Sequence, residues 1–337
     1  MPLPLIPLLV GAGALLGAGY GVKKGLDAKE DFDTAESITA EARSIYDKAV
    51  KALNTTRENT QDALEELGKT KLEAVDAGLK PFAAAFEKIK NVELDENIEL
   101  NPVLSITTEL ADIQKIVLEI SDVLKGGIAA VSGGALAGFG AFGAAGMLAT
   151  ASTGTAISAL SGVAATNATL AWFGGGALAA GGLGMAGGTL VLGGIVAAPV
   201  LAVGGFLLAS KAEEAVNDAY SNLEKAKGAA ESMKAARTAA KAILKRTQEI
   251  NSVLDSLLPH FEAANDELRE LVSRETDYRV IKNNARDKYV VQKSCALART
   301  ITNILKTPVF DDNGAVTQAS RDMLKNSRQF LESLAAL

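Results

Sequence analysis

The side chains that most often act as nucleophiles, general bases or metal ligands are scarce in this sequence. It has one histidine, His260, which argues against a Ser-His triad or a histidine-based metal site, and one cysteine, Cys295, which excludes an internal disulfide. We expect His260 to lie at a helix start and Cys295 to be a buried, inert thiol. The phosphate-binding pattern GxxxxGKS/T does not occur. The sequence therefore predicts no enzymatic activity and no bound cofactor or metal.

A cluster of basic residues stands out in a chain whose net charge is −6. Residues 269–306 hold nine basic and four acidic side chains, a local charge of +5, with Tyr278 and Tyr289 among them. Such a stretch can bind anionic lipid or a nucleic-acid strand. A solvated helix face is the more common explanation. The candidates for polyanion binding are Arg274, Arg279, Lys282, Arg286, Lys288 and Lys293.

The longest feature of the sequence is an uncharged segment, residues 126–210. Its 85 residues include no Asp, Glu, Lys, Arg or His, so every charge of the chain lies outside it. About 20 apolar residues span a bilayer as a helix, so the segment is long enough for two to four spans. Its middle, residues 150–169, is rich in Ser and Thr. The simplest layout is a helical hairpin that turns within residues 161–169.

Glycine and alanine dominate this segment, and several recur every four residues. In lipid, helices associate through close packing of such small residues, whereas glycine weakens a helix in water by about 1 kcal/mol relative to alanine. We therefore expect a membrane-inserting segment. The alternative is a buried hairpin inside a soluble bundle, which is also how soluble pore-forming proteins carry their insertion segments. The predicted packing positions are Gly134, Gly138, Gly176, Ala180, Gly184 and Gly188.

Residues 1–25 form a second apolar stretch. Three prolines occur among the first seven residues and no basic residue precedes the apolar run, so a signal peptide is not predicted. Gly13, Gly17 and Gly21 lie one helical turn apart, a spacing that permits close contact between membrane helices. We expect either a membrane anchor or a buried terminal arm.

Elsewhere, apolar residues recur at alternating spacings of three and four, which predicts long amphipathic helices over residues 26–79, 107–125 and 212–257. The last of these would be roughly 70 Å long. Its seam of alanines suits antiparallel packing against the helix at 107–125. Gly78 and Pro81 predict the end of the first helix, and Pro259 predicts the end of the third.

Beyond Pro259 the pattern predicts shorter helices at residues 261–278, 286–305 and 317–334. Residues 82–101 are mixed, and fit either a short strand pair or an irregular cap. The predicted fold class is all-α: an elongated long-helix or coiled-coil bundle that carries a membrane-inserting hairpin. The predicted divisions are an N-terminal segment (1–25), a helical body in two halves (26–125 and 211–337) and the uncharged segment (126–210) between them.

The glycine-rich block of residues 152–215, beginning STGTAISALSG and containing LAWFGGGALAAGGLGMAGG, resembles glycine-zipper bacterial membrane proteins. Together with its flanking helices it resembles the transmembrane channel effectors of the Hailong anti-phage system. That resemblance implies a cytoplasm-facing helical body, an oligomeric channel, and repression by a DNA oligomer that a partner nucleotidyltransferase makes. The layout of a helical bundle with an apolar hairpin is also similar to the ClyA-like α-helical pore-forming toxins.

We therefore expect a membrane-permeabilising effector or ion channel at the bacterial inner membrane, with a cytoplasmic helical body, acting in anti-phage defence. The expected partners are the lipid bilayer, further copies of the chain, and an inhibitory nucleic-acid oligomer or protein. One alternative is a secreted α-helical pore-forming toxin. Another is a membrane-anchored coiled-coil scaffold that forms no pore.

Overall fold

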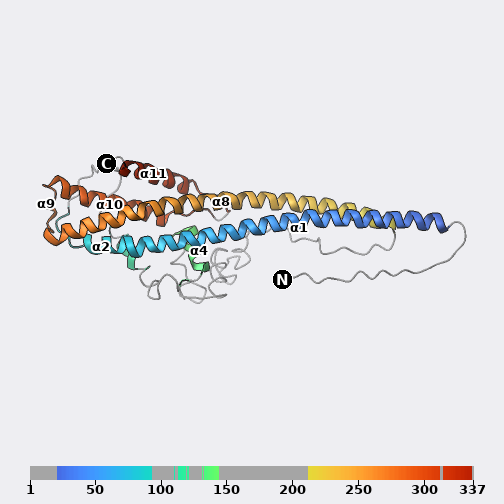
Figure 1. Cartoon of the computed structure of the whole chain (residues 1–337), viewed down its shortest axis with the longest axis horizontal. Helices are drawn as coiled ribbons and strands as arrows, with labels where there is room; N and C mark the ends of the chain where they lie inside the picture. Colours follow the sequence, from blue (N-terminus) through green and yellow to red (C-terminus); the bar gives the residue numbers. More distant parts are fainter. Residues whose placement is uncertain are drawn as a thin grey trace, which may run out of the picture. The chain divides into compact units, whose positions relative to one another are not determined.

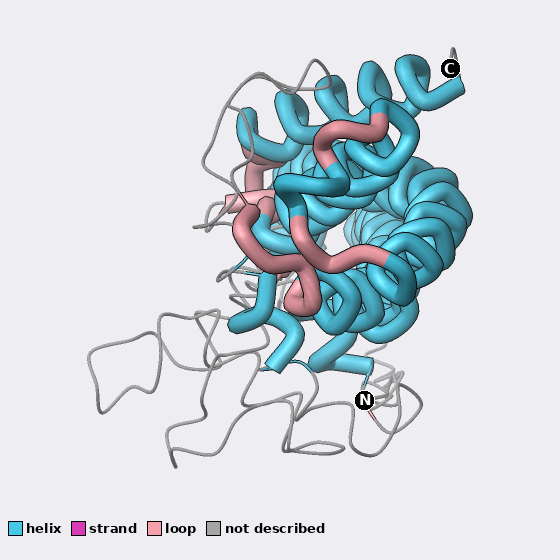
Figure 2. Tube along the Cα trace, turned by 90° about the vertical axis from the view of Figure 1, so that its left-hand side faces the viewer, coloured by secondary structure: helices cyan, strands magenta, loops and turns pink. Residues whose placement is uncertain are grey.

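The structure, a computed structural model, is all-α, as the sequence predicted. Every regular element among the described residues is a helix (Figure 1), and the β-type pairing among them consists of two isolated bridges, Lys90 with Asp277 and Phe310 with Val316. Figure 2 shows the described helices in cyan and the described loops in pink. The structure describes residues 21–92, 110, 113–118, 120, 131, 133–143, 212–311 and 314–335.

The first long helix, α1 (Gly21–Glu73), continues without interruption into a π-helical turn, η1 (Ala74–Leu79), and then into α2 (Lys80–Phe86). The predicted end at Gly78 and Pro81 is therefore wrong. Pro81 lies directly after the π-helical turn, at the start of α2. The side-chain amide of Asn265 donates a hydrogen bond to the Gly78 carbonyl at 2.9 Å, so this irregular turn has a partner for its backbone.

The second long helix, α8 (Ala212–Arg274), runs through Pro259, which corrects the predicted break there. A proline inside a helix removes one backbone hydrogen bond and crowds the preceding turn. Apolar packing on both sides outweighs that cost, because Leu257 and Phe261 are fully buried. Pro259 itself is exposed, so its ring does not compete for space in the core.

The helices α1 and α8 run parallel. The Thr60 hydroxyl donates to the Ala240 carbonyl at 3.3 Å, and further along both helices Asn265 donates to Gly78. Residue numbers therefore rise together along both helices. The predicted antiparallel packing of residues 212–257 against residues 107–125 stays a prediction, because most of residues 107–125 lie outside the described residues. A stripe of alanines fixes which face of a helix is buried but leaves the direction of its partner open.

The chain divides into two compact units, residues 1–50 with 199–231 and residues 51–198 with 232–337. The first contains the N-terminal parts of α1 and α8. Its core is small and rich in alanine, so two helix backbones can pack closely in it. This core consists of Ala35, Ile38, Ala42, Ala219, Leu223 and Ala226.

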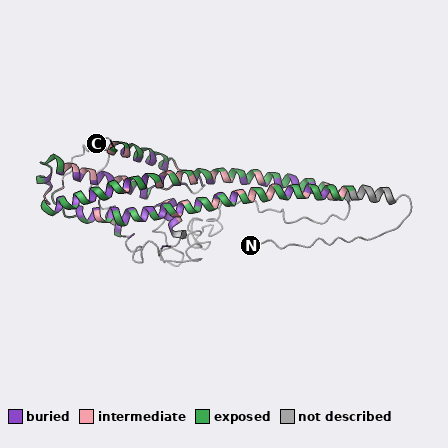
Figure 3. Cartoon of the chain, viewed as in Figure 1, coloured by how far each residue is buried: buried purple, intermediate pink, exposed green. Residues whose placement is uncertain are grey.

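The second unit holds the larger core. Here α1 and α8 are joined by α9 (Tyr278–Ile281), α10 (Ala285–Lys306), α11 (Gln318–Ala335) and a helical piece at residues 113–118. Buried residues form stripes along the long helices, with exposed faces between them (Figure 3). Ile113, Val117 and Ile120 are buried, as expected for the apolar face of the amphipathic helix predicted over residues 107–125. Within the described residues, no helix is both long enough and apolar enough to cross a bilayer.

Candidate functional site: the groove that holds helix α4

Helix α4 (Gly133–Phe142) is the described part of the uncharged segment that has regular structure. It lies in the second unit, where Leu136, Phe139 and Ala141 join the large core. Phe139 and Ala141 are fully buried. This stretch of the uncharged segment is therefore packed against the charged helical body, as the buried-hairpin alternative requires of it.

Glycines bring α4 unusually close to α1. A Cβ atom added to Gly68 would lie 2.0 Å from the Leu136 carbonyl oxygen, and one added to Gly140 would lie 2.1 Å from the Leu64 carbonyl oxygen. Contacts that short do not occur, so both positions require glycine. The two helices thus meet backbone to backbone, the kind of contact that small residues permit.

The C-terminal end of α4 is held by the chain that follows α10. Gly143 adopts a positive φ of 65°, and its N–H donates to the Phe139 carbonyl at 2.8 Å, as in a left-handed helix cap. The Val309 N–H donates to the Ala141 carbonyl at 2.7 Å. The rings of Phe142 and Phe310 pack edge to face with centroids 4.9 Å apart. Carbonyls that a helix end leaves unpaired are therefore bonded here.

Lys71 of α1 completes this cap from inside the core. Its side chain is fully buried, and its Nζ donates to the carbonyls of Gly140 at 2.9 Å and Phe139 at 3.3 Å. The same nitrogen lies 5.8 Å from the centre of the Phe139 ring. Within the described residues no carboxylate forms an ion pair with Lys71. Burial alone lowers the pKa of its amine from 10.5 to about 7.

The predicted packing glycines fall partly within this site. Gly134 and Gly138 belong to α4, and Gly138 is buried. Gly176, Ala180, Gly184 and Gly188 lie outside the described residues. Gly68 and Lys71 were not among the predicted residues. The sequence did hold one indication of this site, Gly68, because a glycine in the middle of a charged helical stretch suggests a close backbone contact.

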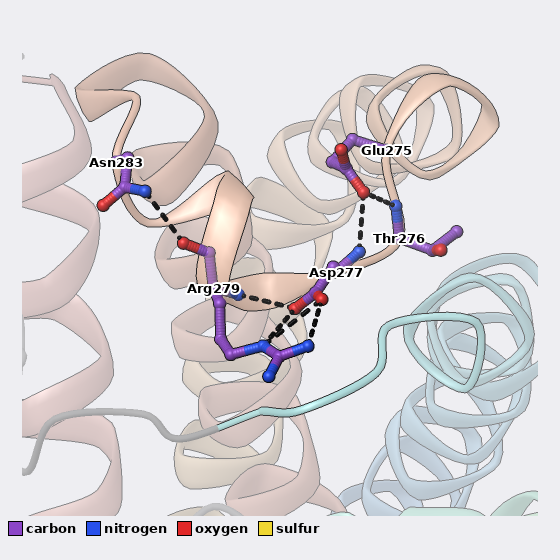
Figure 4. Close-up of polar contacts among 5 residues, drawn as sticks. All are labelled: Glu275, Thr276, Asp277, Arg279 and Asn283. Atoms are coloured by element: carbon purple, nitrogen blue, oxygen red, sulfur yellow. Dashed lines mark hydrogen bonds and ion pairs between the residues drawn. The ribbon is translucent and has the colours of Figure 1, made fainter.

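The candidate polyanion-binding residues surround the α8–α9–α10 turns, and several are committed to ion pairs. Arg274 pairs with the Asp287 carboxylate at 2.5 Å, and Lys293 pairs with Glu267 at 3.3 Å. Arg279 forms several hydrogen bonds with Asp277, the shortest of 2.6 Å (Figure 4). Carboxylates of the same chain therefore partly neutralise three of the six predicted cations.

Asp277 organises these turns. Its carboxylate accepts a hydrogen bond from the Arg279 backbone N–H at 3.0 Å and so caps the N-terminus of α9. Glu275 accepts from the backbone N–H groups of Thr276 and Asp277, each at 2.8 Å. Hydrogen bonds from Arg279 lower the pKa of Asp277 well below its ordinary value. These contacts make this part of the basic stretch a structural corner.

The remaining three cations, Lys282, Arg286 and Lys288, have no ion-pair partner among the described residues. Lys282 and Arg286 are exposed and Lys288 is half-buried. They flank the N-terminus of α10, where Asn284 caps the helix by accepting from the Arg286 and Asp287 backbone N–H groups. Of the six predicted polyanion-binding residues, these three are therefore the ones whose charge is available for a polyanion.

The two residues first considered for chemistry lie apart from these features. Cys295 is buried in α10, as predicted, and His260 is exposed in the interior of α8, which corrects its predicted place at a helix start. The described part of the chain holds no group of His, Cys, Asp or Glu side chains that could bind a metal ion. Comparison with models of known protein families, with curated proteins and with solved structures finds no match to this chain.

Proposed function

We propose that this protein is a membrane-permeabilising effector that oligomerises in the bacterial inner membrane, acts in anti-phage defence, and is held inactive until triggered. The observation that carries the proposal is the uncharged segment itself. Residues 126–210 are four times as long as a single membrane span needs, and they interrupt a densely charged helical protein. A soluble domain has no ordinary use for so long an uncharged stretch rich in glycine.

The packing of α4 supports an inactive state. A protein that permeabilises the membrane of its own cell must keep its apolar segment away from lipid until it is needed. Leu136 and Phe139, both within that segment, are buried against α1 and the rest of the large core. Every close contact of α4 described above is intramolecular, so the helix has to leave this groove before it can face lipid.

A bacterial strain with controlled expression provides the test. The full chain should collapse the membrane potential, read with a voltage-sensitive dye, within the time of its synthesis or after its trigger. The matched control replaces residues 144–210 with a polar linker of equal length and keeps α4 and its groove. If the full chain is stably expressed, sediments with membranes, and leaves both the potential and vesicle contents unchanged under all triggers tried, the proposal is wrong.

A membrane-anchored coiled-coil scaffold is the second candidate, favoured by the long parallel pair of α1 and α8. Thr60 and Arg237 both make cross-helix hydrogen bonds in that pair. A scaffold and an effector would both sediment with membranes, but only the effector would release a trapped dye from vesicles. A secreted toxin, by contrast, would permeabilise cells when purified protein is added from outside.

For the restraint, we propose a polyanionic partner that contacts Lys282, Arg286 and Lys288. The overall charge of −6 repels a polyanion from most of the surface, so a local cluster is needed to hold one. These side chains lie near the N-terminus of α10, where the helix dipole favours an anion such as a phosphate group. A DNA oligomer of the kind implied by the Hailong resemblance fits this chemistry.

A further inference from the structure

Lys71 is a buried lysine, and within the described part of the chain its polar contacts all belong to one helix. Both hydrogen-bond acceptors of its Nζ, the carbonyls of Phe139 and Gly140, lie on α4, and so does the aromatic ring beside it. Its neighbours on its own helix, Leu67 and Leu72, are fully buried and apolar. Since α4 supplies its cover, water can reach the amine when α4 moves away.

The protonated and neutral forms of Lys71 fit this enclosure differently. A neutral amine has two N–H donors, which match the two carbonyl acceptors. An ammonium ion has a third donor and a full charge, and transferring a charge out of water is unfavourable without a paired counter-ion. No carboxylate or other charged group contributes to its titration in the described structure, on α1, α4, α8 or α10.

We propose that Lys71 couples the docking of α4 to protonation: a proton gained by this amine favours the state in which α4 has left its groove and Lys71 faces water. The docked state is held by the backbone contacts at Gly68 and Gly140 and by burial of Phe139. The lysine opposes these contacts more strongly when it is charged. Combined with the proposed function, on which this consequence rests, loss of the docked state makes α4 available to lipid.

The sign of the pH dependence follows from proton linkage. Burial lowers the pKa of Lys71 in the docked state to about 7, whereas an exposed lysine titrates near 10.5. The undocked state therefore binds the proton more tightly, and docking is most stable above both values. Lowering the pH from about 9 to about 7 should raise the undocking constant about fiftyfold, and a further unit should add less than about twofold.

Hydrogen exchange of the full chain, followed by mass spectrometry, measures this constant. Backbone amides of residues 133–142 should be about fiftyfold less protected at about pH 7 than at about pH 9, after correction for intrinsic exchange rates. Amides of α8 near Ile250, in the same molecule, serve as the reference and should change much less. If α4 and α8 change by the same factor, or α4 does not change, the proposal is wrong; this comparison needs only the wild type.

Lys71→Met is the matched variant, because methionine has a similar length and no titratable group. Its α4 amides should have protection that is independent of pH over the same range. A pH dependence equal to that of the wild type would assign the effect to another group and overturn the proposal. Since the methionine leaves the Gly140 carbonyl without its donor, only the slope with pH, and not the absolute protection, is compared.

Dye release from vesicles with anionic lipid separates this inference from the proposed function. Pore formation in the wild type that is faster at about pH 7 than at about pH 9, with no such difference in Lys71→Met, supports both. A pH-dependent loss of α4 protection without dye release keeps the role of Lys71 and overturns the proposed function. Equal dye release by both proteins at both pH values, with no change in α4 protection, overturns the role of Lys71 alone.

Discussion

Gly140 of α4 lies so close to α1 that a Cβ atom on it would be 2.1 Å from the carbonyl oxygen of Leu64. Backbone atoms cannot move aside as the end of a flexible side chain can. A methyl group at this position must therefore push the two helices apart. That separation also weakens the contact between Lys71 and the end of α4.

Gly140→Ala is accordingly expected to weaken docking of α4 by about 1–3 kcal/mol, the usual effect of overpacking a tight contact. Hydrogen exchange of residues 133–142 measures this loss directly. Gly228→Ala is the matched control, since a Cβ there meets nothing within 4 Å. Alanine at 228 should stabilise α8 by up to about 1 kcal/mol. Unchanged protection of α4 in Gly140→Ala would contradict the close contact.

Pro259 gives a prediction about the long helix α8. Replacing it with alanine should raise the free energy of unfolding by roughly 1–3 kcal/mol, because alanine restores a backbone donor and relieves crowding in the preceding turn. Proline is exposed here, so the change leaves no cavity. Urea denaturation followed by circular dichroism measures the change, with His260→Ala, the exposed neighbour, as the control. A loss of stability in Pro259→Ala would mean that a proline-induced bend is required by the packing around Phe261.

The spacing of apolar residues was enough to predict the long helices and their buried faces. Ala42 and Leu53 on α1, and Ala226 and Ile250 on α8, all lie on predicted stripes and are buried. Such a stripe carries information because each residue on it contacts the same partner helix. Phe32 belongs to the same apolar pattern of the helix predicted over residues 26–79 but is 49% exposed, and the described residues of the small core begin beyond it, at Ala35.

Direction and long-range contact could not be predicted in the same way. The parallel pairing of α1 with α8 depends on how the intervening chain returns, which local periodicity does not encode. The burial of Lys71 could not be predicted either, because lysine is ordinarily an exposed residue. The two groups that accept hydrogen bonds from Lys71 are backbone carbonyls, which every residue has. Gly68 and Gly140 bring the backbones of α1 and α4 together. Each is required to be glycine only because the other helix lies against it, which a single stretch of sequence does not reveal.

Asp277 gives a prediction about acid stability. Hydrogen bonds from Arg279 lower its pKa in the folded protein, so its contribution to stability is present above the ordinary value of 3.8 and is lost as the pH falls below it. Wild type should therefore lose more stability than Asp277→Asn between about pH 6 and about pH 3. Arg279→Met should show a smaller loss than the wild type over the same range. Equal losses in all three proteins, measured by urea denaturation, would exclude this pairing as a source of acid sensitivity.

The last prediction concerns the proposed polyanionic restraint. Reversing Lys282, Arg286 and Lys288 to glutamate should weaken oligonucleotide binding and increase toxicity on expression, because these three cations have no carboxylate partner among the described residues. Arg279 is left intact, since its loss would also disturb the cap of α9.

Salt dependence makes this test quantitative. If the three side chains neutralise three phosphates of a single strand, the slope of log affinity against log salt should fall in magnitude by about 2 in the triple variant. The control reverses Lys48, Lys51 and Lys225, which are exposed on the long helices and change the net charge equally. Both proteins must first be confirmed as folded by circular dichroism. If the wild type binds no oligonucleotide at low salt and the triple variant is no more toxic than the control, these cations only solvate the N-terminal end of α10, and the restraint on α4 lies elsewhere.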